Sequence, residues 1–143
     1  MKNALWLPVL ALFACCAALA TDGPLTPPKA PAGAMAYIVA PADGAVVSNP
    51  VTVVFGLKGM GVAPAGVENA DTGHFHLLID TGLPPQGVPI PKDDKHLHFG
   101  GGQTQATLTL KPGKHTLQLL MGDANHLSFD PPVASPVITV TVK

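Results

Sequence analysis

The chain has 143 residues and a formal net charge of -1, and only 12% of its residues are charged. It contains no arginine, so it has neither a strongly basic surface nor the guanidinium groups that nucleic-acid and phosphate recognition use. We therefore expect no nucleic-acid partner, and the length suits one folded domain.

The N-terminus has the features of an export signal. Lys2 is followed by an apolar run over residues 4–19, and Ala18-Leu19-Ala20 has the small-residue spacing of a cleavage site. We expect residues 1–20 to be a signal peptide and the mature protein to be periplasmic or secreted. No later run approaches the roughly 20 apolar residues of a membrane span, so we expect no transmembrane segment in the mature chain.

Both cysteines lie inside this N-terminal segment. Cleavage after Ala20 would remove Cys15 and Cys16, and the mature chain would then have neither a disulfide nor a thiolate ligand. Leu12-Phe13-Ala14-Cys15 is an imperfect lipoprotein box, so lipid anchoring through Cys15 is the alternative to a free mature protein.

Composition then divides the mature chain into two parts. Residues 21–34 are rich in proline, alanine and glycine and predict a linker. Residues 35–143 contain short apolar-alternating runs separated by turn residues, which predicts an all-β, immunoglobulin-like antiparallel β-sandwich of about seven strands. The predicted strands are 36–40, 51–57, 74–80, 96–99, 105–110, 115–121 and 137–142, and the predicted turns include 111–114.

Two of these strands carry a His-x-His pair. Alternate residues of a strand point to opposite faces, so the core side of 74–80 should hold Phe75, Leu77 and Ile79. That leaves His74 and His76 on the other face, and the same alternation places His96 and His98 together on one face of their strand.

Imidazoles two residues apart on one strand face can converge on a transition-metal ion, and imidazole suits both copper and zinc. His126 and Asp123 fall in a loop after a strand, where binding residues gather. Met60, in a Gly-Met-Gly turn, would add a thioether that favours copper. The sequence thus predicts a copper-type metal site, with zinc as the alternative, drawn from His74, His76, His96, His98, His126, Asp123 and Met60.

Structural explanations compete with this hypothesis. A histidine pair on a sandwich can be a solvated face, Met60 can be a packing residue, and Asp123 can hydrogen-bond its own turn. His115 shares the parity of Leu117 and follows a tight turn, which favours a structural role. The run 100–102 is three glycines and predicts a bulge or corner where the backbone approaches a neighbour closely.

Several stretches together resemble a known family. They are 59–66, 73–80, 98–104, 112–117 and 122–126 with 130–133. These motifs are similar to those of the bacterial exported family known as domain of unknown function 4399. The resemblance implies export and the domain boundaries, and it implies no activity or cofactor.

No enzyme class stands out in the sequence. The mature chain has no cysteine nucleophile, and its serines lie outside any nucleophile-elbow motif. The question of catalysis stays open, with a non-catalytic role favoured. The alternative to metal binding is therefore an exported interaction or adhesion module with structural histidines and a periplasmic protein partner, because sandwiches often serve as scaffolds for binding.

Overall fold

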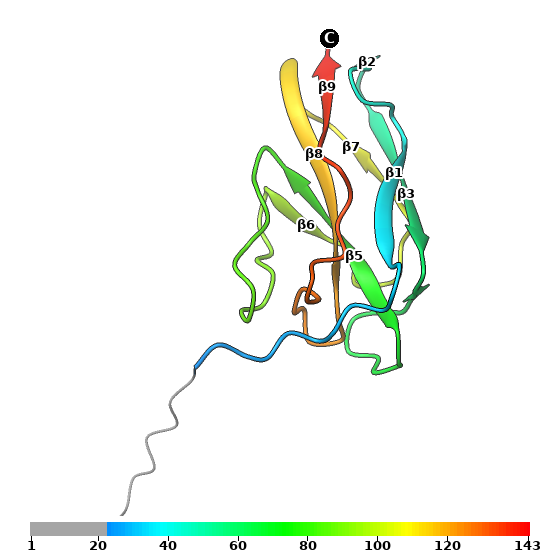
Figure 1. Cartoon of the computed structure of the whole chain (residues 1–143). Helices are drawn as coiled ribbons and strands as arrows, with labels where there is room; N and C mark the ends of the chain where they lie inside the picture. The colour runs from blue at the N-terminus through cyan, green and yellow to red at the C-terminus, as the bar shows by residue number, and fades with distance from the viewer. Residues whose placement is uncertain (1–22) are drawn as a thin grey trace, which may run out of the picture.

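The computed structural model describes residues 23–143, which form nine β-strands in two sheets (Figure 1). The predicted signal peptide, with Cys15 and Cys16, lies outside the described residues. The all-β prediction and the sandwich are confirmed, whereas the immunoglobulin-like assignment stays a prediction. Among residues 23–143, no helix is long and apolar enough to cross a membrane.

The smaller sheet has three antiparallel strands in the order β1, β3, β7. The larger sheet has the order β2, β9, β8, β5, β4, and β6 also pairs with β5. The strands are β1 Met35–Ala40, β2 Val46–Val47, β3 Val51–Lys58, β4 Gly61–Val62, β5 Thr72–Ile79, β6 His96–His98, β7 Gln105–Leu108, β8 Gly113–Gly122 and β9 Ile138–Val142.

All seven predicted strands are present, with ends that move by one to two residues. The two strands that the sequence did not predict, β2 and β4, have two residues each, too few for an alternation to be visible. The prediction of a turn over residues 111–114 is wrong for residues 113 and 114, which belong to β8. Gly113 has a φ of 129° and pairs with Val142, so β8 begins there and not at His115.

The main core fills the space between the two sheets. Phe75, Leu77 and Ile79 of β5 point into it, as the alternation predicts, and Phe55 of β3 packs against Phe75 with ring centroids 5.1 Å apart. Each such buried side chain contributes about 1.5–3 kcal/mol relative to exposure. Burial of these three side chains therefore determines that the alternate residues of β5 project from its opposite face.

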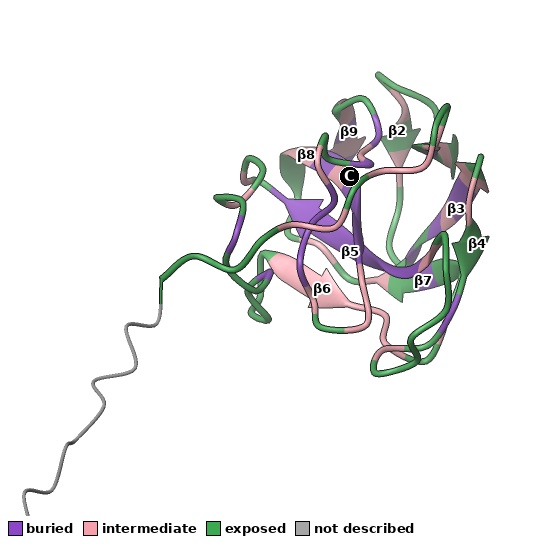
Figure 2. Ribbon diagram, turned by 60° about the horizontal axis from the view of Figure 1, so that its bottom comes forward, coloured by how far each residue is buried: buried purple, intermediate pink, exposed green. Residues whose placement is uncertain are grey.

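The outer face of the larger sheet is covered as well. Leu78 of β5, Leu120 of β8 and Ile90 form a second buried cluster on this side. Ile90 belongs to the proline-rich loop between β5 and β6, which thus acts as a cover. Figure 2 shows β5 buried along its length, while β6 at the sheet edge has intermediate burial.

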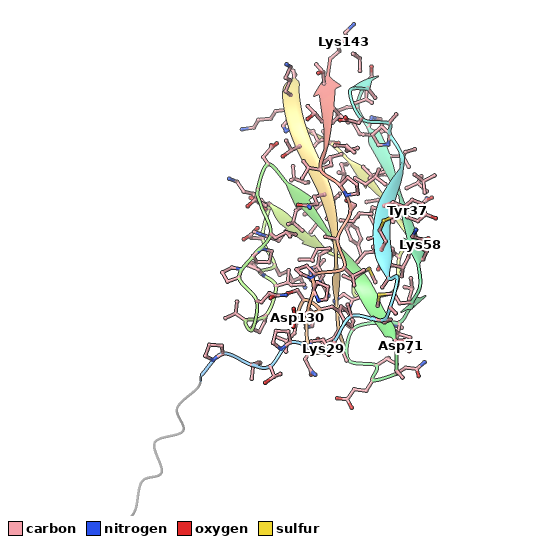
Figure 3. The ribbon with its side chains drawn as sticks, viewed as in Figure 1. Lys29, Tyr37, Lys58, Asp71, Asp130 and Lys143 are labelled. Carbon is pink, nitrogen blue, oxygen red and sulfur yellow. The ribbon has the colours of Figure 1, made fainter. Side chains whose placement is uncertain are left out.

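The segment before β1 lies against two loops of the domain. Leu25 N donates to Gly87 O at 2.7 Å, and Asp130 N donates to the carbonyl oxygen of Pro28 at 2.8 Å. The Lys29 ammonium lies 2.8 Å from the carboxylate of Asp130 (Figure 3). Residues 23–34 therefore contact the sandwich, and the predicted linker boundary at residue 34 stays a prediction.

His115 joins the start of β8 to the end of β5. Its Nδ1 lies 2.7 Å from Oδ2 of Asp80 and its Nε2 lies 2.8 Å from Lys111 O. Both ring nitrogens face acceptors, so the imidazolium form, which donates from both, fits this position. The hydrogen bond to Asp80 raises the pKa of His115, with a further contribution from Lys111 O.

This pairing predicts a pH-dependent contribution to stability. A raised pKa in the folded state means that the contribution is complete below about pH 6.5, the value for an unfolded chain, and is lost as pH rises through the folded pKa. Because the pair is partly exposed, we expect its worth to be roughly 1 kcal/mol or less. The free energies of unfolding of the wild type and of Asp80→Asn, measured with denaturant, should differ below about pH 6.5 and converge once the pH exceeds the raised pKa of His115. A difference in the free energy of unfolding that stays constant across the window would contradict the pairing.

Candidate metal centre

Three histidines meet where β6 pairs with β5. The antiparallel register places His76 directly opposite His98 and Leu77 opposite Leu97. Since directly opposed residues project from the same face of a sheet, the His76 and His98 rings lie side by side. His74 lies two residues before His76 on β5, so it shares their face.

The donor atoms of these three side chains lie close enough to hold one ion. His74 Nε2 and His76 Nε2 are 3.0 Å apart, and one ring nitrogen from each of His74, His76 and His98 lies within 4.8 Å of the others. The ring centroids are 4.9 to 5.1 Å apart. This trio could therefore bind a metal ion.

His126 adds a fourth imidazole from the loop after β8. Its Nε2 lies 3.0 Å from Nε2 of His98, and its ring centroid lies 5.0 Å from that of His74. Asp123 shapes this loop, since its Oδ1 accepts hydrogen bonds from the backbone N–H groups of Asn125 and Leu127. We name His74, His76, His98 and His126 the histidine cluster.

Burial keeps the inner half of the cluster neutral. His74 and His76 are fully buried. Desolvation, followed by the neighbouring imidazoles, lowers the pKa of His74 to about 4 and that of His76 to about 3. Desolvation also lowers the pKa of His98. These rings are therefore unprotonated at neutral pH, which is the form that binds a metal.

The hydrogen bonds of the cluster are incomplete. Nδ1 of His74 and Nδ1 of His76 are buried and have no partner among the described residues. In each of the pairs His74–His76 and His98–His126, two Nε2 atoms face each other at 3.0 Å, so one of them must donate and the other accept. Leaving a buried polar atom unpaired costs about 1–3 kcal/mol. An ion held between the facing Nε2 atoms would take up their lone pairs, but it would not reach the two Nδ1 atoms.

The nitrogen spacing matches a coordination sphere. A metal–nitrogen distance of about 2.0–2.1 Å places adjacent ligands roughly 2.9 Å apart in a square plane and about 3.3 Å apart in a tetrahedron. The two closest Nε2 pairs of the cluster, at 3.0 Å each, lie between these values. The spacing accommodates copper or zinc and does not choose between them.

The other predicted ligands are not gathered into the cluster. Nδ1 of His96 lies 2.8 Å from the carboxylate of Asp93, and Met60 packs against the main core. Asp123 uses one carboxylate oxygen to hold its own loop. Their part in metal binding stays a prediction.

Two glycines leave room for the cluster. A β-carbon on Gly100 would lie 2.6 Å from Nε2 of His98, and one on Gly122 would lie 3.0 Å from Nε2 of His76. The sequence indicated a close backbone approach at 100–102 but gave no role to Gly122. The role of Gly122 follows from its pairing with His74 across β5 and β8, which is visible only in the structure.

This close packing predicts that Gly100→Ala weakens metal binding without removing a ligand. The added methyl group must displace the His98 ring, and we expect the dissociation constant to rise by about tenfold to a hundredfold, as for other groups that orient metal ligands. Titration with Cu(II) or Zn(II) measures this change. Gly82→Ala is the matched control, because its methyl group would meet nothing within 4 Å. Equal affinities for the two variants would contradict the role of Gly100.

Comparison with known proteins gives a family and no chemistry. No curated protein and no solved structure matches the chain. A family model with the description "Domain of unknown function (DUF4399)" matches residues 53–143, a span that includes the whole histidine cluster. That span is more than half of the 143-residue chain, and the chain therefore belongs to the DUF4399 family, as its sequence motifs predicted.

Proposed function

We propose that this protein binds a transition-metal ion, copper in the first place, through the histidine cluster. The carrying observation is that four imidazoles from two strands and one loop gather with ring centroids 4.8 to 6.1 Å apart, and that their Nε2 atoms face each other in two pairs, His74 with His76 and His98 with His126. Two of these rings are fully buried. A solvated histidine face would have its rings turned to water.

The donor set favours Cu(II) or Zn(II) over Cu(I). Soft sulfur ligands select Cu(I), whereas imidazole suits the divalent ions. Met60 and Met121 belong to the main core between the sheets, on the side of β5 opposite the cluster. In the part of the chain that the structure describes, the gathered donors are therefore nitrogen atoms.

We propose further that the protein works in the periplasm or outside the cell. The support is the N-terminal apolar run and the Ala18-Leu19-Ala20 cleavage pattern, with anchoring through Cys15 as the alternative.

Of the divalent ions that imidazole suits, copper leads in affinity. We assign metal binding and no catalytic step.

One observation favours the rival function, an interaction module. Met35, Tyr37 and Val39 alternate along β1 and are all exposed, at 37%, 38% and 57% of their surface. They form an apolar stripe on the outer face of the smaller sheet, and exposed apolar patches mark interaction sites when they are large. This stripe lies on the sheet opposite the one that carries the cluster, so the two functions can be tested separately.

Metal titration of the mature protein without a histidine tag tests the proposal. We expect one-to-one binding of Cu(II) with a submicromolar dissociation constant, in competition with a chelator of known strength, or of Zn(II) if zinc is the cargo. The double variant His76→Ala/His98→Ala should lose this binding because it removes half of the donors. Thermal unfolding of the variant checks that it still folds.

His96→Ala is the matched control. It removes a histidine from the same strand as His98 but leaves the cluster intact, so its affinity should equal that of the wild type. Binding by the wild type no tighter than that of a surface histidine pair would refute the proposal and leave the interaction module as the better hypothesis.

A further inference from the structure

The four histidines of the cluster are held with unequal firmness. His74 and His76 lie within β5, which pairs with β8 on one edge and with β4 and β6 on the other. His98 ends β6 and is paired with His76. His126 is the one member that no strand carries. The first two are fully buried, whereas His98 and His126 have intermediate exposure, so the cluster opens to solvent on their side.

The backbone at His126 has an unusual conformation. Its φ is 65°, in the left-handed region that a β-carbon disfavours. Two backbone hydrogen bonds hold the residue: His126 N donates to Asp123 O at 3.0 Å, and Ile90 N donates to His126 O at 2.8 Å. A ligand on such a loop is released by a smaller rearrangement than a ligand within a paired strand.

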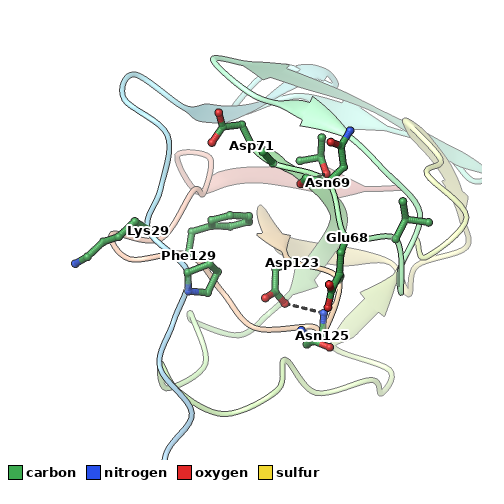
Figure 4. Close-up of a pocket in the computed structure, with 12 residues that line it drawn as sticks. Lys29, Glu68, Asn69, Asp71, Asp123, Asn125 and Phe129 are labelled. Carbon is green, nitrogen blue, oxygen red and sulfur yellow. Dashed lines mark hydrogen bonds between the residues drawn. The ribbon is translucent and has the colours of Figure 1, made fainter.

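The loop also has space beside it. Asp123, Ala124 and Asn125 line a cavity of about 450 Å³, together with Glu68 and Asp71 (Figure 4). One backbone hydrogen bond, from Gly66 N to Ala124 O at 3.0 Å, ties the loop to the segment that precedes β5. The lining holds three carboxylates and one lysine, Lys29, which is paired with Asp130, so its charge favours the approach of a cation.

We infer that His126 is the exchangeable ligand of the metal site, and that the ion passes to and from external donors at the position that its Nε2 occupies. This inference rests on the proposed function. The exchange is a ligand substitution: the lone pair of an incoming donor replaces that of His126 Nε2, and no electron is transferred. The acceptor is an imidazole, carboxylate or thioether donor of another molecule, and His74, His76 and His98 retain the ion until the acceptor has bound it.

Two variants test this asymmetry. His126→Gly removes the loop ligand and also suits the positive φ, which glycine adopts freely, whereas His76→Ala removes a strand ligand. Each protein is loaded with whichever of Cu(II) and Zn(II) the wild type binds more tightly, and release to excess EDTA is followed with time. We expect His126→Gly to retain one-to-one binding, weakened about tenfold to a hundredfold, and to release the ion at least about tenfold faster than the wild type. His76→Ala should lose stoichiometric binding.

Free imidazole provides a second readout. In His126→Gly it can occupy the vacated position, and we expect millimolar imidazole to restore the affinity and the absorption spectrum of the Cu(II) form, or that of a Co(II)-substituted form if zinc is the cargo. His96→Ala is the matched control, because it removes a histidine of β6 that lies outside both the cluster and the loop. Its release rate should equal that of the wild type.

The possible failures are distinguishable. A wild-type protein that binds no metal refutes the proposed function itself. If the wild type binds but His126→Gly loses binding as completely as His76→Ala, or releases the ion no faster than the wild type, then the site is a rigid four-histidine site and the inference about His126 is wrong. Absence of rescue by imidazole in a variant that still binds metal would also overturn it.

Discussion

The antiparallel pairing of β5 with β6 is the constraint on which the site depends. Its register places His76 opposite His98, and this register is fixed from the other face of the sheet. A slip by one residue would turn Phe75 and Leu77 out of the core and carry the histidines into it. The histidines of the cluster therefore inherit their positions from hydrophobic packing, and the cluster is assembled without an ion.

This preorganisation has a cost in stability. Two fully buried imidazoles have unpaired Nδ1 atoms, and a hydrophobic residue at either position would avoid that cost. An ion that binds only the folded chain raises the free energy of unfolding. At an ion concentration a hundredfold above the dissociation constant, the increase is about 2.7 kcal/mol. The protein is thus expected to gain its full stability with the metal bound.

Strand alternation made much of this predictable. It gave the inward set of β5 and placed His74 and His76 together, because period-two patterning depends only on local sequence. The partnership of β5 with β6 was not predictable in the same way, since residues 74–80 and 96–99 are separated by a loop whose path the sequence does not specify. The burial of His74 and His76 was missed for the same reason: Ile90, within a run of prolines, covers the outer face. Met60 was predicted as a ligand because its thioether lies in a Gly-Met-Gly turn. In the structure this side chain packs against the main core instead.

The histidines of the folded part also show that the partner decides the chemistry of this side chain. His115 faces an acceptor with each ring nitrogen, so its raised pKa favours the cation, which has no lone pair for a metal. Within the histidine cluster, nitrogens face nitrogens in a desolvated site, and the lowered pKa values of His74 and His76 keep their lone pairs free. The two groups lie toward opposite ends of β5, so their separation follows from the fold. A count would treat these histidines alike. Their hydrogen-bond partners separate His115, which forms a structural ion pair, from the histidine cluster, which offers candidate metal ligands.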